Sequence, residues 1–183
     1  MALGVVFVAA ALIGGIVLLV GGGDDDSDSG GEQVRGLQES VLDRTVVIAE
    51  EGISVRRPGN WRQKKEQGVI TLLSPNRCVS VNLAAPFDAN QTAQLRRDSL
   101  AALRQLHEKV RVGPGGPGNV GGIPTTSNTI TVTDEKGNQR RVLLGIGRGK
   151  KHAYVTQVVL GNPRCQQELA VAQVILSSVE YTK

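Results

Sequence analysis

The pattern of hydrophobic and polar positions divides this chain of 183 residues into three parts. Residues 3–20 form an unbroken apolar run of 18 residues without charge, amide or hydroxyl groups. A polar stretch rich in Asp, Ser and Gly follows at 24–40. Beyond it, short apolar segments alternate with polar turns up to the end of the chain. The pattern predicts an apolar N-terminal helix, a linker and one folded domain over 41–183.

Several segments of the domain have the alternation or the continuous apolar character that is typical of strands. In the segment 77–85, Cys78, Ser80 and Asn82 share one face of a strand, and the valines between them share the other. The segments with this character are 45–62, 68–74, 77–85, 128–134, 140–147 and 152–160.

Two stretches have helical periodicity instead. Leu95, Leu103 and Val110 fall on one side of a helix over 91–111, and a closing helix is expected over 164–179. The glycine- and proline-rich stretch 113–122 is expected to end the first helix as a flexible connector. The order ββββ-α-βββ-α, with short turns between consecutive strands, predicts the α+β class: an antiparallel sheet with helices packed on it.

The apolar run at the N-terminus has the length of a membrane span. As a helix, residues 3–20 extend about 27 Å, and the three glycines that follow bring the length to about 30 Å. A cleavable signal has a shorter apolar region and a basic start. We therefore expect residues 1–23 to be an uncleaved, single-pass signal-anchor. Cleavage near the glycines is the alternative, and the missing basic flank leads to the hypothesis that the true start lies upstream.

Charge is distributed unevenly along the chain. Residues 1–32 contain five of the 17 acidic residues and none of the 21 Lys and Arg residues, so the rest of the chain holds 12 acids against 21 bases. A basic domain on an acidic linker suggests an anionic neighbour, such as lipid headgroups, an envelope polymer or nucleic acid. The plainer alternative is a soluble domain that its charge keeps from aggregating.

The chain has two cysteines, Cys78 and Cys165. They can be buried thiols, a metal pair or a disulfide. Zinc needs three or four ligands, and neither His107 nor His152 has metal-type spacing to a cysteine. If the anchor places the domain outside the membrane, oxidation is favoured, and we predict a Cys78–Cys165 disulfide. No metal or other cofactor is expected.

Motifs that carry chemistry are weak in this sequence. GPGGPG (113–118) satisfies the dinucleotide-binding pattern of glycines, but a helix precedes it and a strand follows, so no phosphate would meet a helix N-terminus. No serine lies in a nucleophile elbow, and no Cys–His pair has a catalytic context. We therefore predict no catalytic residues and no enzymatic activity.

The expected contact face is basic. Arg148, Lys150 and Lys151 surround a hairpin turn, and we expect them to cluster with Arg140 and Arg141 of the preceding strand as a possible anion-contact face. A merely solvated hairpin tip is the alternative. Nucleic-acid binding is not favoured, because the few aromatic residues are dispersed and form no stacking platform.

Three phrases of the sequence are similar to parts of a known superfamily. GISVRRPGNW (52–61), the glycine turn with three strands at 120–159, and AQVILSSVE (172–180) resemble PsbP-like domains, shared by a photosystem II extrinsic protein and a Ran-binding import factor. The resemblance implies an α/β/α-type sandwich around an antiparallel sheet over residues 45–181. It carries neither manganese-cluster support nor Ran binding to this chain, because no residues here match those sites.

These observations lead to one functional expectation with two alternatives. The chain is expected to be a membrane-anchored, extracytoplasmic binding or assembly module of the cell envelope, with an anionic envelope polymer or an envelope protein as partner. The first alternative is a small envelope enzyme or ligand carrier whose pocket lies between sheet and helix. The second is a nucleic-acid binder, which requires the domain to face the cytoplasm.

Overall fold

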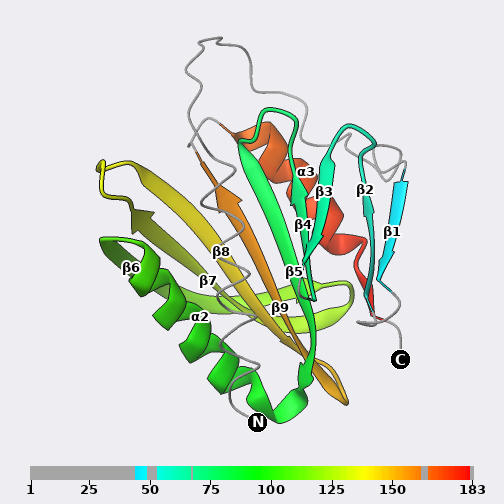
Figure 1. The fold of residues 1–183 in the computed structure, drawn as a ribbon. Helices are drawn as coiled ribbons and strands as arrows, with labels where there is room; N and C mark the ends of the chain where they lie inside the picture. Colours follow the sequence, from blue (N-terminus) through cyan, green and yellow to red (C-terminus); the bar gives the residue numbers. More distant parts are fainter. Residues whose placement is uncertain (1–43, 49–52, 67, 162–164, 182–183) are drawn as a thin grey trace.

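The structure is a computed structural model that describes residues 44–48, 53–66, 68–161 and 165–181 (Figure 1). The predicted anchor at 1–23 and the linker at 24–40 lie outside the described residues, so both stay predictions. Within the described ranges, no helix combines the length and the apolar character that a membrane crossing requires.

Two antiparallel sheets and two longer helices make up the described part of the fold. Along the chain the elements are β1 (Arg44–Ile48), β2 (Ile53–Arg57), β3 (Arg62–Glu66), β4 (Val69–Leu73), β5 (Val79–Asp88), a short 3-10 turn (Ala89–Gln91), α2 (Thr92–Leu106), β6 (Lys109–Val120), β7 (Ile123–Thr133), β8 (Gln139–Arg148), β9 (His152–Leu160), α3 (Gln166–Ser177) and β10 (Glu180–Tyr181). The larger sheet has the order β3-β4-β5-β9-β8-β7-β6, and the smaller one β1-β2-β10. The expected α+β class with an antiparallel sheet is confirmed.

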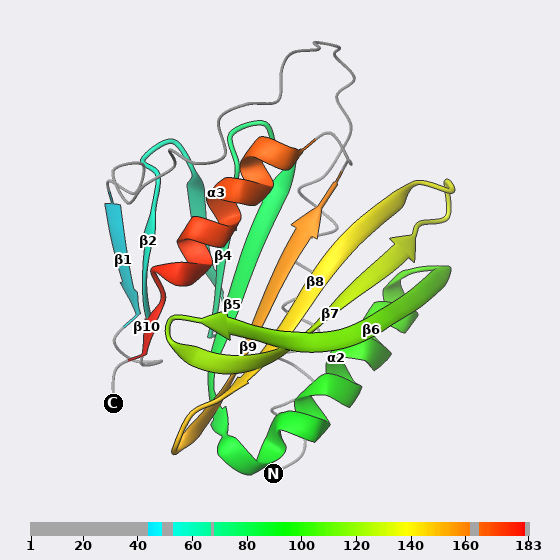
Figure 2. The ribbon, with the colours of Figure 1, turned by 180° about the vertical axis from the view of Figure 1, so that it is seen from behind.

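The helices cover opposite faces of the seven-stranded sheet (Figures 1 and 2). The α2 face carries apolar residues such as Val142, Leu144 and Val155, which form one core with Leu95 and Leu103 of α2. The α3 face carries the alternate positions, and its core also includes residues of the small sheet; buried members are Val55, Val79, Val81, Val158, Ala172 and Ile175. Alternate residues of the strands thus form a separate apolar core on each side of the sheet.

The smaller sheet is joined to the larger one at the end of the chain. β10 pairs with β2, which places Tyr181 in the register of Ile53. The ring of Tyr181 packs against Tyr154 of β9, with 3.7 Å between ring centroids. Burial raises the pKa of both phenols, and for Tyr181 the neighbouring Tyr154 adds to the effect. Both tyrosines are therefore neutral at physiological pH.

The stretch 113–122, expected to be a flexible connector, is instead mostly strand. β6 runs through it to Val120 and pairs with β7, with a register shift between Val112 and Gly115. Two prolines fit because β6 is an edge strand, where one side of the backbone needs no donor. A Cβ at Gly113 would lie 2.8 Å from the carbonyl oxygen of Thr129, so this glycine permits the close approach of the two strands.

The first helix is shorter than expected, and two further strands were not predicted. α2 ends at Leu106, and His107 already has extended backbone angles. Val110 packs into the α2-side core from β6, because pairing with Val132 replaces the helical position that the periodicity suggested. The charged segment of β3 (RQKKE), exposed throughout, is the opposite edge of the sheet; charged side chains are typical of a protected edge. The two-residue β10 was also not predicted.

Candidate functional site

The five basic residues expected to form one face are divided between the two ends of β8 (Figure 1). Arg140 and Arg141 lie at its beginning, and Arg148 is its last residue, with Lys150 and Lys151 in the turn to β9. Arg148 lies eight positions along the strand from Arg140, which is about 26 Å. The structure therefore does not bring the five together. Anion binding at either end stays a prediction.

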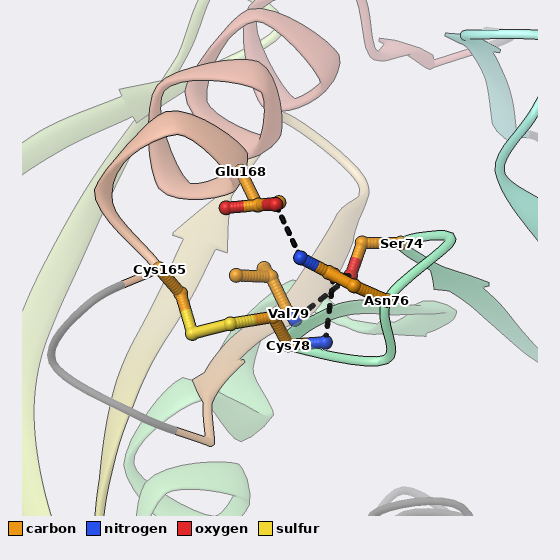
Figure 3. Close-up of a disulfide and its surroundings, with 6 residues drawn as sticks. All are labelled: Ser74, Asn76, Cys78, Val79, Cys165 and Glu168. Carbon is orange, nitrogen blue, oxygen red and sulfur yellow. Dashed lines mark hydrogen bonds between the residues drawn. A yellow bond between two sulfur atoms is a disulfide. The ribbon is translucent and has the colours of Figure 1, made fainter. Parts of the chain in front are cut away.

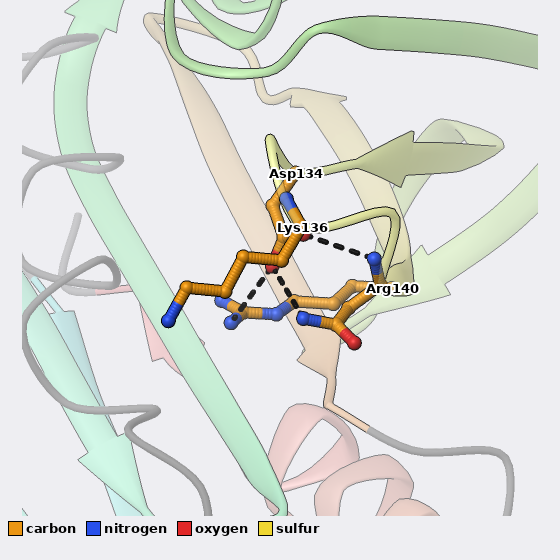
Figure 4. A network of polar contacts seen from close by, with 4 residues as sticks. Asp134, Lys136 and Arg140 are labelled. Atoms are coloured by element: carbon orange, nitrogen blue, oxygen red, sulfur yellow. Dashed lines mark hydrogen bonds and ion pairs between the residues drawn. The ribbon is translucent and has the colours of Figure 1, made fainter.

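Arg140 belongs to the α2 face and is part of a polar network at the β7–β8 turn (Figure 4). Its guanidinium lies 3.8 Å from the carboxylate of Asp134. Asp134 also accepts hydrogen bonds from the backbone N–H groups of Lys136 and Asn138 and from the Asn138 side chain. These bonds, that from the Asn138 side chain most of all, lower the pKa of Asp134. The Asp134 side chain thus caps the turn, and the same carboxylate forms an ion pair with Arg140.

His107 lies close to this network, directly after α2. Its Nδ1 atom is buried and has no hydrogen-bond partner among the described residues. Burial, and then the positive charge of Arg140, lower the pKa of His107 below its ordinary value of 6.5. His107 is thus half-buried and neutral at pH 7.

Arg141 points to the opposite side of the sheet, where it has a neighbour that the sequence did not indicate. Thr131 of β7 is paired with Arg141 on one side and with Arg111 of β6 on the other. Paired residues in adjacent strands project from the same face, so two arginines flank one threonine on the α3 face. Both arginines are exposed. Arg111 was missed because 91–111 was interpreted as a helix, which removed β6 from the sheet.

A row of hydroxyl groups continues from this point along β7. Alternate residues of the strand project from the same face as Thr131, and from Thr125 onward all of them are Thr or Ser: Thr125, Ser127, Thr129, Thr131 and Thr133. Part of the row is flanked by glycines, since Ser127 is paired with Gly116 and with Gly145. A Cβ at Gly145 would lie 2.6 Å from Oγ1 of Thr156. Small residues thus leave the backbone and hydroxyls of this strip without large neighbours.

The predicted disulfide between Cys78 and Cys165 is present, with the two Cα atoms 5.9 Å apart (Figure 3). Cys78 precedes β5, and Cys165 immediately precedes α3. The crosslink therefore attaches the start of α3 to the sheet. Cys165 is buried, with 1% of its surface exposed.

Polar contacts support the same junction (Figure 3). The side-chain oxygen of Asn76 accepts hydrogen bonds from the Cys78 backbone N–H at 3.0 Å and from the Ser74 hydroxyl at 2.8 Å. Its amide nitrogen donates to the carboxylate of Glu168, in the first turn of α3. Asn76 thus links the turn before Cys78 to the helix after Cys165, which fixes both cysteines at bonding distance.

On the α2 face, a row of polar side chains crosses the centre of the sheet. Thr71, Asn82 and Gln157 are direct partners in β4, β5 and β9. The Thr71 hydroxyl donates to Asn82 at 2.9 Å. The Asn82 amide nitrogen and both amide atoms of Gln157 have no partner among the described residues, although the two side chains are only 0% and 1% exposed. Buried amides normally have partners, so this row calls for a physical explanation.

The described residues hold no cluster of three or more His, Cys, Asp or Glu side chains with the geometry of a metal site. Asp134 is engaged as described above. The groups that the structure does bring together are cations, hydroxyls and amides. Such groups bind ligands through charge and hydrogen bonds.

Comparison with known proteins places the fold. No protein-family profile and no curated protein matches the sequence. Among solved structures, cyanobacterial PsbP (CyanoP) from Synechocystis sp. is 12% identical and has a TM-score of 0.53; the match covers 84% of this chain and 98% of that chain. This likeness shows that the chain has the PsbP-like fold, as the sequence resemblance indicated.

Other matches are weaker. A protein from Bacteroides thetaiotaomicron is 12% identical with a TM-score of 0.49; the match covers 72% of this chain but only 46% of that chain, so this chain spans less than half of its length. LpqN, described as involved in cell envelope biogenesis of Mycobacterium tuberculosis, is 13% identical with a TM-score of 0.48, covering 72% of this chain and 83% of that chain.

Proposed function

We propose that this protein is a non-catalytic binding or assembly module of the cell envelope, displayed outside the membrane by a single-pass anchor at 1–23. The observation that carries the proposal is the Cys78–Cys165 disulfide. Structural disulfides persist in exported proteins and are rare in the reducing cytosol. A crosslink between cysteines 87 positions apart stabilises a domain by about 4 kcal/mol in the chain-entropy model.

The sequence supports the same location independently. An apolar run of 18 residues precedes the acidic linker, and the linker of 17 residues has a root-mean-square reach of about 20–25 Å. A domain on this tether would stay close to the membrane surface. The domain has 20 bases against 11 acids, and this positive charge favours an anionic partner there, such as an envelope polymer or the acidic surface of an envelope protein.

Topology reporters test the proposal. A reporter enzyme active only outside the membrane and a fluorescent protein that matures only in the cytoplasm are fused separately to the C-terminus of the full chain. We expect an active enzyme and no fluorescence. The matched control lacks residues 1–23 and should reverse both results. Fluorescence from the full-length fusion, with an inactive enzyme, would refute the proposed location and with it the envelope function.

A ligand carrier is the second candidate, and Asn82 and Gln157 favour it. Their unpartnered amide groups are buried among apolar side chains, and a neutral ligand with hydrogen-bonding groups would satisfy them. Native mass spectrometry of the full-length protein isolated from its own membranes distinguishes the candidates. A bound small molecule that the Gln157→Leu variant does not retain would support the carrier. A ligand-free mass for the wild-type protein would contradict it.

A further inference from the structure

Arg111, Thr131 and Arg141 form a triad on the α3 face of the sheet. We propose that this triad, with the hydroxyl row of β7, binds a linear phosphodiester polymer. The inference rests on the proposed function, since such a polymer belongs to the cell envelope. It replaces the hairpin tip with a different surface, in which only Arg141 belongs to the originally expected basic set.

The register places Arg111, Thr131 and Arg141 side by side on three adjacent strands. Two inter-strand spacings separate the arginine Cα atoms by about 10 Å. Arginine side chains are long enough to converge on one phosphate across this distance or to hold two successive phosphates. Guanidinium groups match phosphate oxygens with paired hydrogen bonds, which a single ammonium does not.

The residues paired with Arg111 and Arg141 carry no negative charge. No acid faces either arginine in register: Arg141 lies between Thr131 and Leu160, and Arg111 is on the edge strand. Glu108 lies 3.8 Å from Lys109, and Asp134 is bonded within its own turn, where Glu135 is exposed. Among the described residues, the register thus pairs neither arginine with an acid, and both arginines are exposed.

The length of the hydroxyl row of β7 favours a polymer over a single headgroup as the ligand. From Thr133 to Thr125 the hydroxyl row extends about 26 Å along β7, which is much longer than one phosphate group. Within it, Oγ1 of Thr125 is buried without a partner among the described residues, on a side chain only 7% exposed. Gly116, beside Ser127, has open space where a side chain would be. A narrow, uncharged, hydroxyl-bearing track that leads from two cations fits an extended chain of alternating phosphates and polyols.

The experiment measures binding of full-length protein, in neutral detergent, to poly(glycerol phosphate). The test variant carries Arg111→Glu and Arg141→Glu. The control carries Arg148→Glu and Lys150→Glu, which make the same change in net charge at the other end of β8. We expect the test variant to lose about 100-fold in affinity, roughly tenfold per charge-assisted contact, and the control to change about threefold or less. Affinity of the wild type should fall with added salt.

Further probes separate the remaining possibilities. Polyglutamate should bind more weakly than poly(glycerol phosphate) if paired hydrogen bonds to phosphate matter, and Arg111→Lys with Arg141→Lys should give intermediate affinity. Equal losses in the test and control variants would overturn the triad in favour of diffuse charge. Arginine-dependent binding to phosphatidylglycerol vesicles, without binding to the polymer, would overturn the polymer in favour of the membrane surface. If no probe binds while the topology reporters place the domain outside, this inference fails and the proposed function stands.

Discussion

The two faces of the seven-stranded sheet hold their helices in different ways. α3 is attached at its start by the Cys78–Cys165 disulfide, and just past its end the Ser178 hydroxyl accepts a hydrogen bond from the Arg56 backbone N–H at 3.0 Å. α2 has no such crosslink. Leu95, Ser99 and Leu103 are buried in α2, and Ala172 and Ile175 in α3, so the helices differ in their attachment rather than in the number of buried residues. Leu106, at the end of α2, is 43% exposed.

This difference indicates that the two faces differ in rigidity. The α3 face, with its crosslink and the smaller sheet, is a fixed frame, and the proposed triad lies on that frame. The α2 face has an apolar core and no crosslink, and the unpartnered amides of Asn82 and Gln157 lie on the same face of the sheet. A helix without a covalent attachment to the sheet opens at lower free energy than a crosslinked one, so α2 is the element expected to detach first.

The largest expected effect comes from removing the crosslink of the α3 face. Replacing both cysteines, Cys78→Ala with Cys165→Ala, should lower the free energy of unfolding by about 4 kcal/mol, because the denatured chain regains the freedom of a long loop. Urea unfolding of the variant and of the oxidised wild type measures the difference. Reduced wild type is the control and should match the variant. A loss below about 1 kcal/mol would mean that the frame does not depend on the disulfide.

The β6–β7 turn contacts the chain just after α3, at the end of the helix opposite to the disulfide. Gly121 has φ of +57°, and a Cβ there would lie 1.9 Å from the carbonyl oxygen of Val179, just after α3. Gly121→Ala should therefore destabilise the protein by about 3 kcal/mol, through the clash and the strained backbone. Gly122→Ala is the matched control, because Gly122 also has positive φ but open space around it. It should cost about 1 kcal/mol. Equal costs would show that the turn does not contact the end of α3.

A smaller effect, of opposite sign, is expected on the α2 face. Gln157→Leu removes two buried polar atoms that lack partners and should raise the free energy of unfolding by about 1 kcal/mol. Asn82→Leu would also remove the acceptor of the Thr71 hydroxyl, so it should stabilise less or not at all. Chemical denaturation measures both variants. Destabilisation by Gln157→Leu would indicate that this amide has a partner, as the ligand-carrier candidate requires.

The smallest effect concerns the pH dependence of the α2 side. His107 has a lowered pKa in the folded protein, so the unfolded chain binds a proton more readily as the pH falls below 6.5. The stability contribution is complete above that pH and declines below it. Asp134, whose pKa is also lowered, acts only below its ordinary value of 3.8 and does not interfere. Thermal unfolding of wild type should shift slightly downward from pH 7.5 to 5.5, and His107→Gln should remove that shift. An unchanged shift in the variant would assign the effect to other groups.

Much of the fold follows from local sequence patterns. Alternation in 77–85 identified both faces of β5, including the positions of Ser80 and Asn82, and the two cysteines were correctly expected to pair. These features depend on residues near one another in sequence, or on a choice between only two thiols. Helical periodicity likewise located the buried residues Leu95 and Leu103 of α2.

The missed features depend on contacts between distant residues. Periodicity alone does not distinguish a helix from a strand at Val110, whose position is decided by pairing with Val132. Glycine and proline in β6 indicate a connector locally, yet an edge strand tolerates them. That one error hid Arg111. The grouping of the basic residues of β8 was a separate error, because a strand was already expected over 140–147. Separation along a strand, and the face to which each residue points, divide them in the structure.

The oxidation state of Cys78 and Cys165 in the native cell tests the central claim most directly. Cells are lysed in acid, free thiols are alkylated, and the intact mass of the protein is compared with and without prior reduction. We predict no alkylation before reduction and two alkyl groups after it, as expected for an exported, crosslinked domain. Two alkylated thiols without reduction would contradict the extracytoplasmic location and the crosslinked frame together.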